Sequence, residues 1–197
     1  MTEILMIAVL AGGEGRRMGG IKALRPFRGA PLVAHALGLA RRWSDQVVVA
    51  VRDAGQLAGA IEAELALDRT DIAGPLAGLA AALQHARAAG ATRLFTLPCD
   101  MPRLPPALPA QLAAALAADH GVALPRIEGE LQPTCGLWRT AALDRLPAYL
   151  ASGQSSLRGF AAACGLSVVD FGPDAAAAFA NVNSPEDLAR LEAEDTD

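Results

Sequence analysis

Residues 4–22 read ILMIAVLAGGEGRRMGGIK, an apolar run followed at once by a loop rich in glycine and positive charge. A continuous apolar run that stops at a glycine is typical of a strand buried on both faces of a sheet. The loop over residues 10–22 holds five glycines, two arginines and a lysine. Backbone N–H groups and cations that converge in this way favour bound phosphate. The stretch therefore predicts an α/β protein whose first strand leads into an anion-binding loop.

The rest of the chain continues the alternation of short apolar runs and longer alanine-rich stretches. Strand-like runs occupy residues 46–51, 93–98, 121–127, 131–138 and 166–171. Helical patterns occupy residues 31–43, 54–66, 74–90, 105–119, 140–150, 155–165 and 184–194. This alternation predicts an α/β fold with a mainly parallel sheet in one domain. Ligands of such sheets bind beyond the carboxyl ends of the strands, so the loops after residues 10, 51 and 98 are the expected site.

Composition and charge narrow the class of protein further. Of the 197 residues, 52% are hydrophobic and 19% are charged, which provides a sizeable core and excludes wholesale disorder. The net charge of −4 offers no basic surface for nucleic acid or an anionic membrane. Cys99, Cys135 and Cys164 lie far apart, without zinc-binding spacing, which predicts reduced thiols. We expect a cytoplasmic protein with no nucleic-acid or membrane partner.

The first loop matches neither of the two common phosphate motifs. After Gly13 and Gly15, the third glycine of a dinucleotide-binding loop is missing. As a P-loop it has Lys22 one place late and no hydroxyl residue after the lysine. Gly12, Gly13 and Gly15 can still adopt positive φ and approach a ligand closely, while Arg16 can bridge phosphates. The alternative is a solvated turn, but the density of glycine and charge favours a triphosphate cradle.

A single carboxylate follows the strand predicted over residues 93–98. Asp100 stands in LPCDMPRLP, where Pro98 and Pro102 restrict the backbone and aim the side chain. A carboxylate at a strand end suits Mg²⁺ whose other ligands are water and phosphate oxygens. The alternative is an aspartate that bonds its own turn. Opposite a phosphate cradle, we favour the metal site, and we interpret Cys99 as a core residue.

Six stretches of the chain resemble one family in order and spacing. They are LAGGEGRRMGGIK, GAPLVAHAL, GPLAGL, LPCDMP, LQPTCGLWR and FANVNSPEDL. Together they resemble the molybdenum cofactor guanylyltransferases, within the superfamily of sugar-nucleotide-type nucleotidyltransferases. The resemblance covers nearly the whole chain. It implies one Rossmann-like, three-layer domain over residues 1–197, with nucleotide bound by the N-terminal part and the acceptor by the C-terminal part.

The resemblance also implies an activity and its partners. GTP and molybdenum-bound molybdopterin would give the guanine dinucleotide cofactor and pyrophosphate, with Mg²⁺ as cofactor and transient contacts to other proteins of molybdenum cofactor synthesis. The attacking phosphate is already an anion, so no general base is required. Two rivals share the chemistry: a molybdopterin cytidylyltransferase and a sugar-phosphate nucleotidyltransferase. A third, more remote rival is a nucleotide-binding domain without catalysis.

Carried over residue by residue, the resemblance implies these roles. The nucleotide-binding residues would be Leu10, Ala11, Gly12, Gly13, Lys22, Asp68, Gly74 and Asp100. Lys22, Arg16 and Asp100 would be catalytic, Asp100 would hold Mg²⁺, and Asn181 and Asn183 would face the acceptor or complete the metal shell. Asp71 competes with Asp68 for the place beside the nucleoside. Ala50 stands where the family often has asparagine near the base, so Arg52 or backbone groups would have to substitute.

Two of these motifs also have structural interpretations. In NSPEDL, Ser184 and Asp187 predict a capping box and Pro185 fits the first turn of a helix. We therefore assign residues 184–188 to structure and only the two asparagines to function. In GPLAGL, Gly74 and Gly78 serve either close helix packing or close approach of the nucleoside, and the sequence leaves this choice open.

Overall fold

The computed structural model describes residues 3–13, 21–57 and 59–194 of the chain. Within these residues eight strands form one sheet in the order β10-β7-β9-β6-β1-β4-β5, with β8 paired to β7. The strands are β1 (Leu5–Leu10), β4 (Val47–Val51), β5 (Glu64–Leu67), β6 (Arg93–Pro98), β7 (Val122–Ile127), β8 (Glu130–Leu131), β9 (Gly136–Arg139) and β10 (Leu166–Phe171). A separate antiparallel pair joins β2 (Pro26–Phe27) to β3 (Ala30–Pro31). The predicted α/β fold with a mainly parallel sheet is confirmed.

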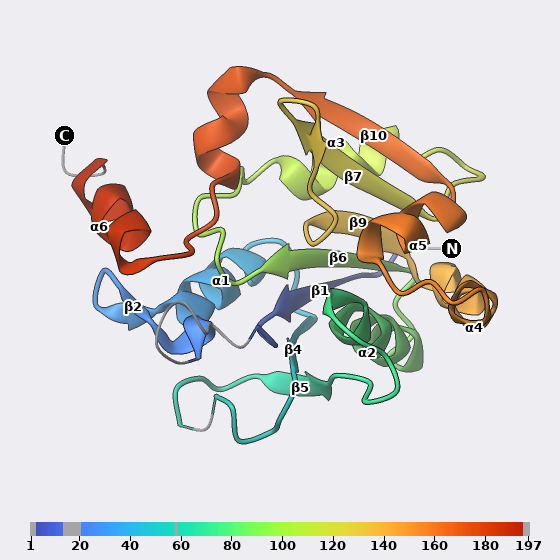
Figure 1. Cartoon of the computed structure of the whole chain (residues 1–197), viewed down its shortest axis with the longest axis horizontal. Helices are drawn as coiled ribbons and strands as arrows, with labels where there is room; N and C mark the ends of the chain where they lie inside the picture. Colours follow the sequence, from blue (N-terminus) through green and yellow to red (C-terminus); the bar gives the residue numbers. More distant parts are fainter. Residues whose placement is uncertain (1–2, 14–20, 58, 195–197) are drawn as a thin grey trace.

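Helices cover both faces of the sheet and make three layers (Figure 1). The helices are α1 (Leu32–Ala40), α2 (Pro75–Ala88), α3 (Leu108–Ala115), α4 (Leu146–Ala151), α5 (Leu157–Ala163) and α6 (Pro185–Glu194), with 3-10 turns η2 (Lys22–Leu24), η3 (Thr140–Arg145) and η4 (Pro173–Phe179). Alternate residues of β1 serve opposite layers. Met6 and Ala8 belong to the apolar cluster that includes α2, α4 and α5, whereas Ile7 and Val9 belong to the cluster that includes α1 and α3. This period of two is the expected pattern of a strand buried on both faces.

Two strands of the sheet, β8 and β9, run against their neighbours, and β9 lies within the main strand order. β9 is antiparallel to both β6 and β7, while β1 is parallel to β4 and β6, and β4 is parallel to β5. The carboxyl ends of β5, β4, β1 and β6 therefore meet at one edge of the sheet, and the start of β9 lies at the same edge. This edge is where a ligand of an α/β sheet is expected.

Two predictions about secondary structure are wrong. The helix predicted over residues 54–66 is not formed, because the chain instead supplies β5, which pairs with the outer side of β4. Pairing and the burial of Ala66 outweigh the helix propensity of an alanine-rich stretch. The strand predicted over residues 131–138 is broken into β8 and β9. Pro133 has no N–H to donate, and the N–H of Cys135 turns back to the carbonyl of Gln132 at 3.0 Å.

Helix ends follow local chemistry more closely. Proline lies in the first turn of α2, α3 and α4, where its missing N–H is not needed. The helix predicted over residues 105–119 is shorter in the structure, where it is α3. The helix predicted over residues 140–150 is divided into η3 and α4. Gly90 ends α2 with φ of 78°. None of the described helices is long and apolar enough to cross a bilayer.

The last helix lies away from the sheet, beside the β2–β3 pair (Figure 1). Apolar side chains of Phe27, Leu32, Val182, Leu188 and Leu191 form a small cluster of their own there. The predicted capping box is confirmed: the N–H of Asp187 donates to Ser184 Oγ at 3.1 Å, and the N–H of Ser184 donates to Asp187 Oδ2 at 3.0 Å. The box fixes the segment that leads from the sheet edge into α6.

Candidate active site

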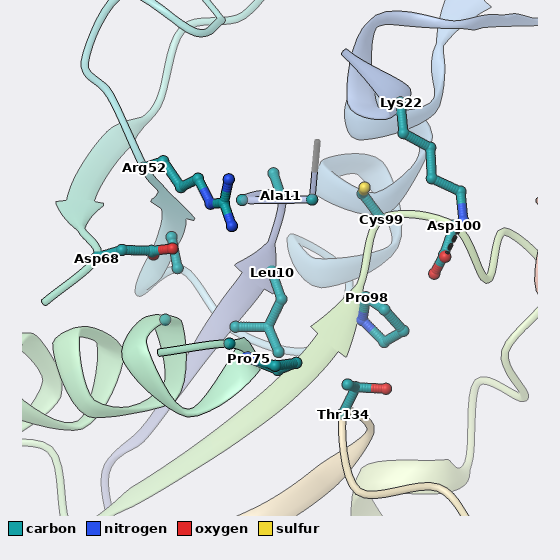
Figure 2. Close-up of a pocket in the computed structure, with 15 residues that line it drawn as sticks. Leu10, Ala11, Lys22, Arg52, Asp68, Pro75, Pro98, Cys99, Asp100 and Thr134 are labelled. Carbon is teal, nitrogen blue, oxygen red and sulfur yellow. Dashed lines mark hydrogen bonds and ion pairs between the residues drawn. The ribbon is translucent and has the colours of Figure 1, made fainter. Parts of the chain in front are cut away.

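A pocket of about 290 Å³ opens at the sheet edge where these strands end. Its lining residues are Leu10, Ala11, Gly12, Gly13, Lys22, Ala50, Arg52, Asp68, Gly74, Pro75, Gly78, Pro98, Cys99, Asp100 and Thr134. Figure 2 shows Arg52 and Asp68 at one end, Lys22 and Asp100 at the other, and Leu10, Ala11 and Pro98 between them. The pocket is therefore an elongated site with charged groups at both ends and backbone in the middle.

The structure brings most of the predicted site residues together. All eight residues predicted to bind nucleotide line this pocket, although they come from four separate segments of the chain. Arg16 lies outside the described residues. Asn181 and Asn183 are both exposed, and neither is among the lining residues. Asn183 is nevertheless connected to the pocket, because it contacts the lining residue Lys22, as described below.

Lys22 joins two distant parts of the chain at one end of the pocket. Its Nζ forms an ion pair with Asp100 Oδ2 and donates a hydrogen bond to Asn183 Oδ1 at 2.7 Å. The lysine and aspartate side chains are only 14% and 18% exposed. The N–H of Val182 also donates to the carbonyl of Asp100 at 2.9 Å. The segment before α6 therefore fixes both members of the charged pair.

One oxygen of Asp100 has an unfulfilled bonding capacity. Asp100 Oδ1 is buried and accepts no hydrogen bond from any described residue. A buried carboxylate oxygen without a partner costs free energy, and a cation in the pocket would satisfy it. One carboxylate with water and phosphate oxygens is a usual ligand set for Mg²⁺. The donor set at this end of the pocket therefore fits the predicted metal.

Asp68 occupies the other end, directly after β5. Its N–H donates to the carbonyl of Val51 at 2.8 Å, which fixes its backbone to the end of β4. Burial raises the pKa of the carboxyl, and the nearby positive charge of Arg52 opposes this rise. Asp68 Oδ1 is buried and has no hydrogen-bond partner among the described residues. The carboxylate is therefore an acceptor held ready for a donor from a ligand.

Two glycines make the space that the Asp68 carboxylate occupies. A Cβ on Gly12 would lie 2.7 Å from Asp68 Oδ2, and a Cβ on Gly78 would lie 3.2 Å from Asp68 Oδ1. Of the three glycines that can adopt positive φ, Gly12 and Gly13 do not have it here, and Gly15 lies outside the described residues. The need at position 12 is steric, not conformational. Gly74 does have φ of 72°, at the turn that starts α2, so glycine is required there by the backbone.

The rival carboxylate, Asp71, lies outside the pocket. It is exposed, and its two oxygens accept hydrogen bonds from the guanidinium of Arg69 at 3.0 and 2.5 Å. This bonding lowers the pKa of Asp71. The structure thus places Asp68, and not Asp71, among the lining residues.

Sequence reasoning missed Thr134 as a pocket residue. Thr134 stands in the loop between β8 and β9, and Figure 2 shows it below Pro98 and on the same side as Asp100. The rule that ligands lie beyond carboxyl ends assumes parallel strands, whereas β9 begins at this edge because it is antiparallel. Pro133 was the signal in the sequence that could have identified Thr134, because a proline inside a predicted strand indicates a break and therefore a loop. Cys99, predicted as core, is buried, and burial raises the pKa of its thiol to about 12, so the thiol stays protonated.

We expect Asp68→Asn to raise the melting temperature near neutral pH. Because burial raises the pKa of Asp68 in the folded protein, the folded state holds this proton more tightly than the unfolded chain does. The ionised carboxylate therefore lowers stability above the folded pKa, and this cost vanishes as the pH falls below the unfolded pKa of about 3.9. Melts at about pH 7 and about pH 4 should show a gain that shrinks on acidification.

Asp71→Asn is the matched control for this measurement. Its pKa is lowered by Arg69, so the same change there removes a favourable interaction and gives no gain at neutral pH. An Asp68→Asn protein that melts below the wild type at neutral pH would contradict the inference that burial raises the pKa of Asp68 and lowers the stability of the folded state.

Comparison with known proteins decides the family. Residues 7–167 match the family model described as the MobA-like NTP transferase domain. The chain belongs to this family. It is 42% identical over 189 residues to a molybdenum cofactor guanylyltransferase of Cereibacter sphaeroides, covering 93% of each chain. It is 40% identical over 193 residues to one of Bordetella petrii, covering 93% of this chain and 94% of the other. The resemblance inferred from the motifs is confirmed, and this member of the MobA-like family is a nucleotidyltransferase.

Solved structures agree with this membership. The molybdopterin-guanine dinucleotide biosynthesis protein A of Archaeoglobus fulgidus superposes with a TM-score of 0.78 at 26% identity, covering 97% of this chain and 98% of the other. The 2-C-methyl-D-erythritol 4-phosphate cytidylyltransferase of Thermus thermophilus superposes with a TM-score of 0.71 at 21% identity, covering 100% of both chains. The second likeness is one of fold alone. The MobA-like chain thus shares its fold with an enzyme named for a different nucleotide and acceptor.

Proposed function

We propose that this chain transfers GMP from GTP to the phosphate of molybdenum-bound molybdopterin, which yields the guanine dinucleotide cofactor and pyrophosphate. One observation carries the proposal. This chain, a member of the family, lines a single pocket at the strand ends with all the residues predicted to bind nucleotide: Leu10–Gly13, Lys22, Asp68, Gly74 and Asp100. A relative that is 42% identical over 93% of the chain has the same named activity.

The distribution of charge in the pocket indicates how GTP would lie. The nucleoside would occupy the end formed by Asp68 and Gly74, against the backbone of residues 10–13. The triphosphate would extend toward Lys22 and Asp100, where the cation and the metal-binding carboxylate lie (Figure 2). In this orientation the buried acceptor of Asp68 faces a base or sugar with donor groups, and the lysine faces anionic oxygens.

The reaction places few chemical demands on the protein beyond charge and position. An oxygen of the acceptor phosphate forms a bond to the α-phosphorus of GTP while the bond to the β-phosphate oxygen breaks, and pyrophosphate leaves with the electron pair. Because the nucleophile is already an anion, no side chain has to remove a proton. The lining residues accordingly include no histidine, and the Cys99 thiol is protonated. Lys22 would neutralise negative charge on the transferring and departing groups, and Arg16 stays a prediction for the same role.

Asp100 would hold Mg²⁺ through its unpaired buried oxygen. When bound, the ion would supply charge neutralisation on the phosphate oxygens. Lys22 keeps the other carboxylate oxygen in place through the ion pair, and the backbone bond from Val182 fixes the aspartate main chain. The chain itself therefore presents the carboxylate in a fixed orientation before any ligand arrives.

The acceptor would bind on the C-terminal side of the pocket. Asn183 is in contact with Lys22, so an acceptor phosphate near this asparagine would lie beside the reacting α-phosphate. Asn181, two residues earlier and exposed, would contact the pterin farther from the reaction centre. We propose that the nucleotide-binding and acceptor-binding parts belong to one domain over residues 1–197. We also propose that it acts in the cytoplasm, where its three free cysteines stay reduced, in transient contact with other proteins of molybdenum cofactor synthesis.

The test is a direct assay of the transfer. The purified chain is incubated with GTP, Mg²⁺ and molybdenum-bound molybdopterin, and both pyrophosphate and the dinucleotide cofactor are measured. We expect both products in equal amounts, and neither when GTP, Mg²⁺ or the pterin is omitted. Faster turnover with CTP, or with a sugar phosphate as acceptor, would overturn the proposal in favour of a rival transferase. Tight GTP binding without pyrophosphate release would identify a domain that binds without catalysis.

A further inference from the structure

The residue after β4 is one of the two substitutes that the sequence offered for a polar group near the base, and the sequence assigned it no contacts. Arg52 follows Val51 directly, its side chain is exposed, and it lines the pocket. Figure 2 shows its guanidinium pointing from the strand end toward Ala11, at the same end of the pocket as Asp68 and far from Lys22. The arginine therefore faces the part of the pocket assigned to the nucleoside.

A glutamine holds the backbone of this arginine against the first loop. The N–H of Arg52 donates to Gln56 Oε1 at 3.1 Å, and Gln56 Nε2 donates to the carbonyl of Ala11 at 2.7 Å. The side chain of Arg52 also approaches the first loop, because a Cβ on Gly12 would lie 3.5 Å from its Cγ. The arginine is thus part of the pocket wall and is positioned by contacts to the segments that follow β1 and β4.

Arg52 and Asp68 together present a set of donors beside a set of acceptors. The charge of Arg52 acts on the Asp68 carboxyl and opposes the effect of burial on its pKa. A guanidinium offers a planar fork of N–H donors, and a carboxylate offers acceptors only. Beside them, Ala50 contributes no polar side-chain group to the lining. Hydrogen bonding to a base at this end of the pocket therefore has a cationic donor and an anionic acceptor as its side-chain partners.

We propose that Arg52 is a base-selecting residue, donating hydrogen bonds to O6 and N7 of guanine while Asp68 accepts from N1–H and the 2-amino group. The inference rests on the proposed function and deepens it. Guanine presents two acceptors, O6 and N7, on the edge next to two donors, and an arginine fork matches those acceptors. Adenine has an amino donor in place of O6, and cytosine has no N7, so both lose the contact. Arg52 would thus supply the polar contact that Ala50, two residues earlier in the chain, does not offer.

The experiment measures nucleotide affinity with an atom-level probe. Dissociation constants for GTP, 7-deaza-GTP and ATP are determined by calorimetry for the wild type, Arg52→Ala and Arg52→Lys. Arg126→Ala is the matched control. Arg126 lies on β7, pairs with Asp170 on β10 and is not among the residues that line the pocket. We expect the wild type to bind 7-deaza-GTP about tenfold more weakly than GTP, and Arg52→Ala to bind both with equal, weaker affinity.

Selectivity separates this role from a general effect of charge. The preference for GTP over ATP should fall about tenfold in Arg52→Ala, should fall also in Arg52→Lys, which keeps the charge but loses the fork, and should stay unchanged in Arg126→Ala. Equal weakening of GTP, 7-deaza-GTP and ATP would overturn the proposal and make Arg52 a phosphate contact. Unchanged constants would overturn it as well.

The outcome is distinguishable from failure of the proposed function. If the wild type transfers GMP but Arg52→Ala keeps its base preference, only the inference about Arg52 is wrong. If the wild type binds GTP selectively but forms no dinucleotide, the transfer activity is wrong while the base selection stands. Melting curves of each variant show that a changed constant comes from the site and not from an unfolded protein.

Discussion

We expect the Asp100→Asn enzyme to fold normally and to turn over at least about a thousandfold more slowly than the wild type. The amide keeps the shape of the side chain and an oxygen that can accept from Lys22. It removes the negative charge that would hold Mg²⁺ at Asp100 Oδ1, the buried carboxylate oxygen that has no hydrogen-bond partner among the described residues. Loss of this one charge therefore removes the ion from the reacting phosphates and leaves the polypeptide framework in place.

The measurement is the rate of pyrophosphate release at saturating GTP, repeated over a range of Mg²⁺ concentrations. Asp71→Asn is the control, because it changes an exposed aspartate that lies near the same pocket but outside its lining. That enzyme should keep the wild-type rate. An Asp100→Asn enzyme with wild-type turnover at ordinary Mg²⁺ concentrations would remove Asp100 from the metal site.

We expect Lys22→Met to lower kcat by about a hundredfold or more with a smaller effect on GTP affinity. Methionine replaces the aliphatic part of the side chain but supplies no charge to the transferring and departing phosphates. The change also removes the ion pair with Asp100 and the hydrogen bond to Asn183, so its effect on the melting temperature must be measured beside its effect on rate. Lys22→Arg keeps a positive charge and should recover part of the lost rate.

Lys22 offers an independent readout, because it is the only lysine in the sequence. An amine-reactive reagent applied to the folded enzyme can modify only this side chain and the chain's amino terminus. Bound GTP should protect Lys22 from the reagent, as followed by mass spectrometry of the peptide that contains it. Modification at the same rate with and without saturating GTP, together with unchanged kcat in Lys22→Met, would contradict a role at the phosphates.

Much of the fold was predictable because burial on both faces leaves a simple mark in a sequence. The strands over 4–10, 46–51 and 93–98 are continuous apolar runs, and the structure has β1, β4 and β6 there. β5 was missed because its residues favour a helix locally and become a strand only through pairing with β4. The single strand predicted over 131–138 was wrong because Pro133 and the turn at Cys135 divide it into β8 and β9.

Site residues were predictable where they follow a strand in the sequence. Contacts between residues from different loops were not predictable. Residues 10–13 and Asp100 follow strands directly, so the rule for strand ends locates them in the pocket. The sequence favoured Asp68 and kept Asp71 as its rival, and the placement of one in the pocket and the other against Arg69 separates them. The steric reason for Gly12 was also hidden, since it lies in the approach of a carboxylate 56 residues away along the chain.

The hydrogen bond between Lys22 and Asn183 also sets an order of events during protein synthesis. Its two residues are 161 positions apart, whereas β1, β4 and β6 are all complete by residue 98. A growing chain can pair these strands while translation continues, because domains begin to fold as they emerge from the ribosome. Lys22 cannot acquire its asparagine partner until the segment leading into α6 has emerged. The Lys22–Asp100 end of the pocket is thus completed only after residue 183 has emerged, later than the strands β1, β4 and β6.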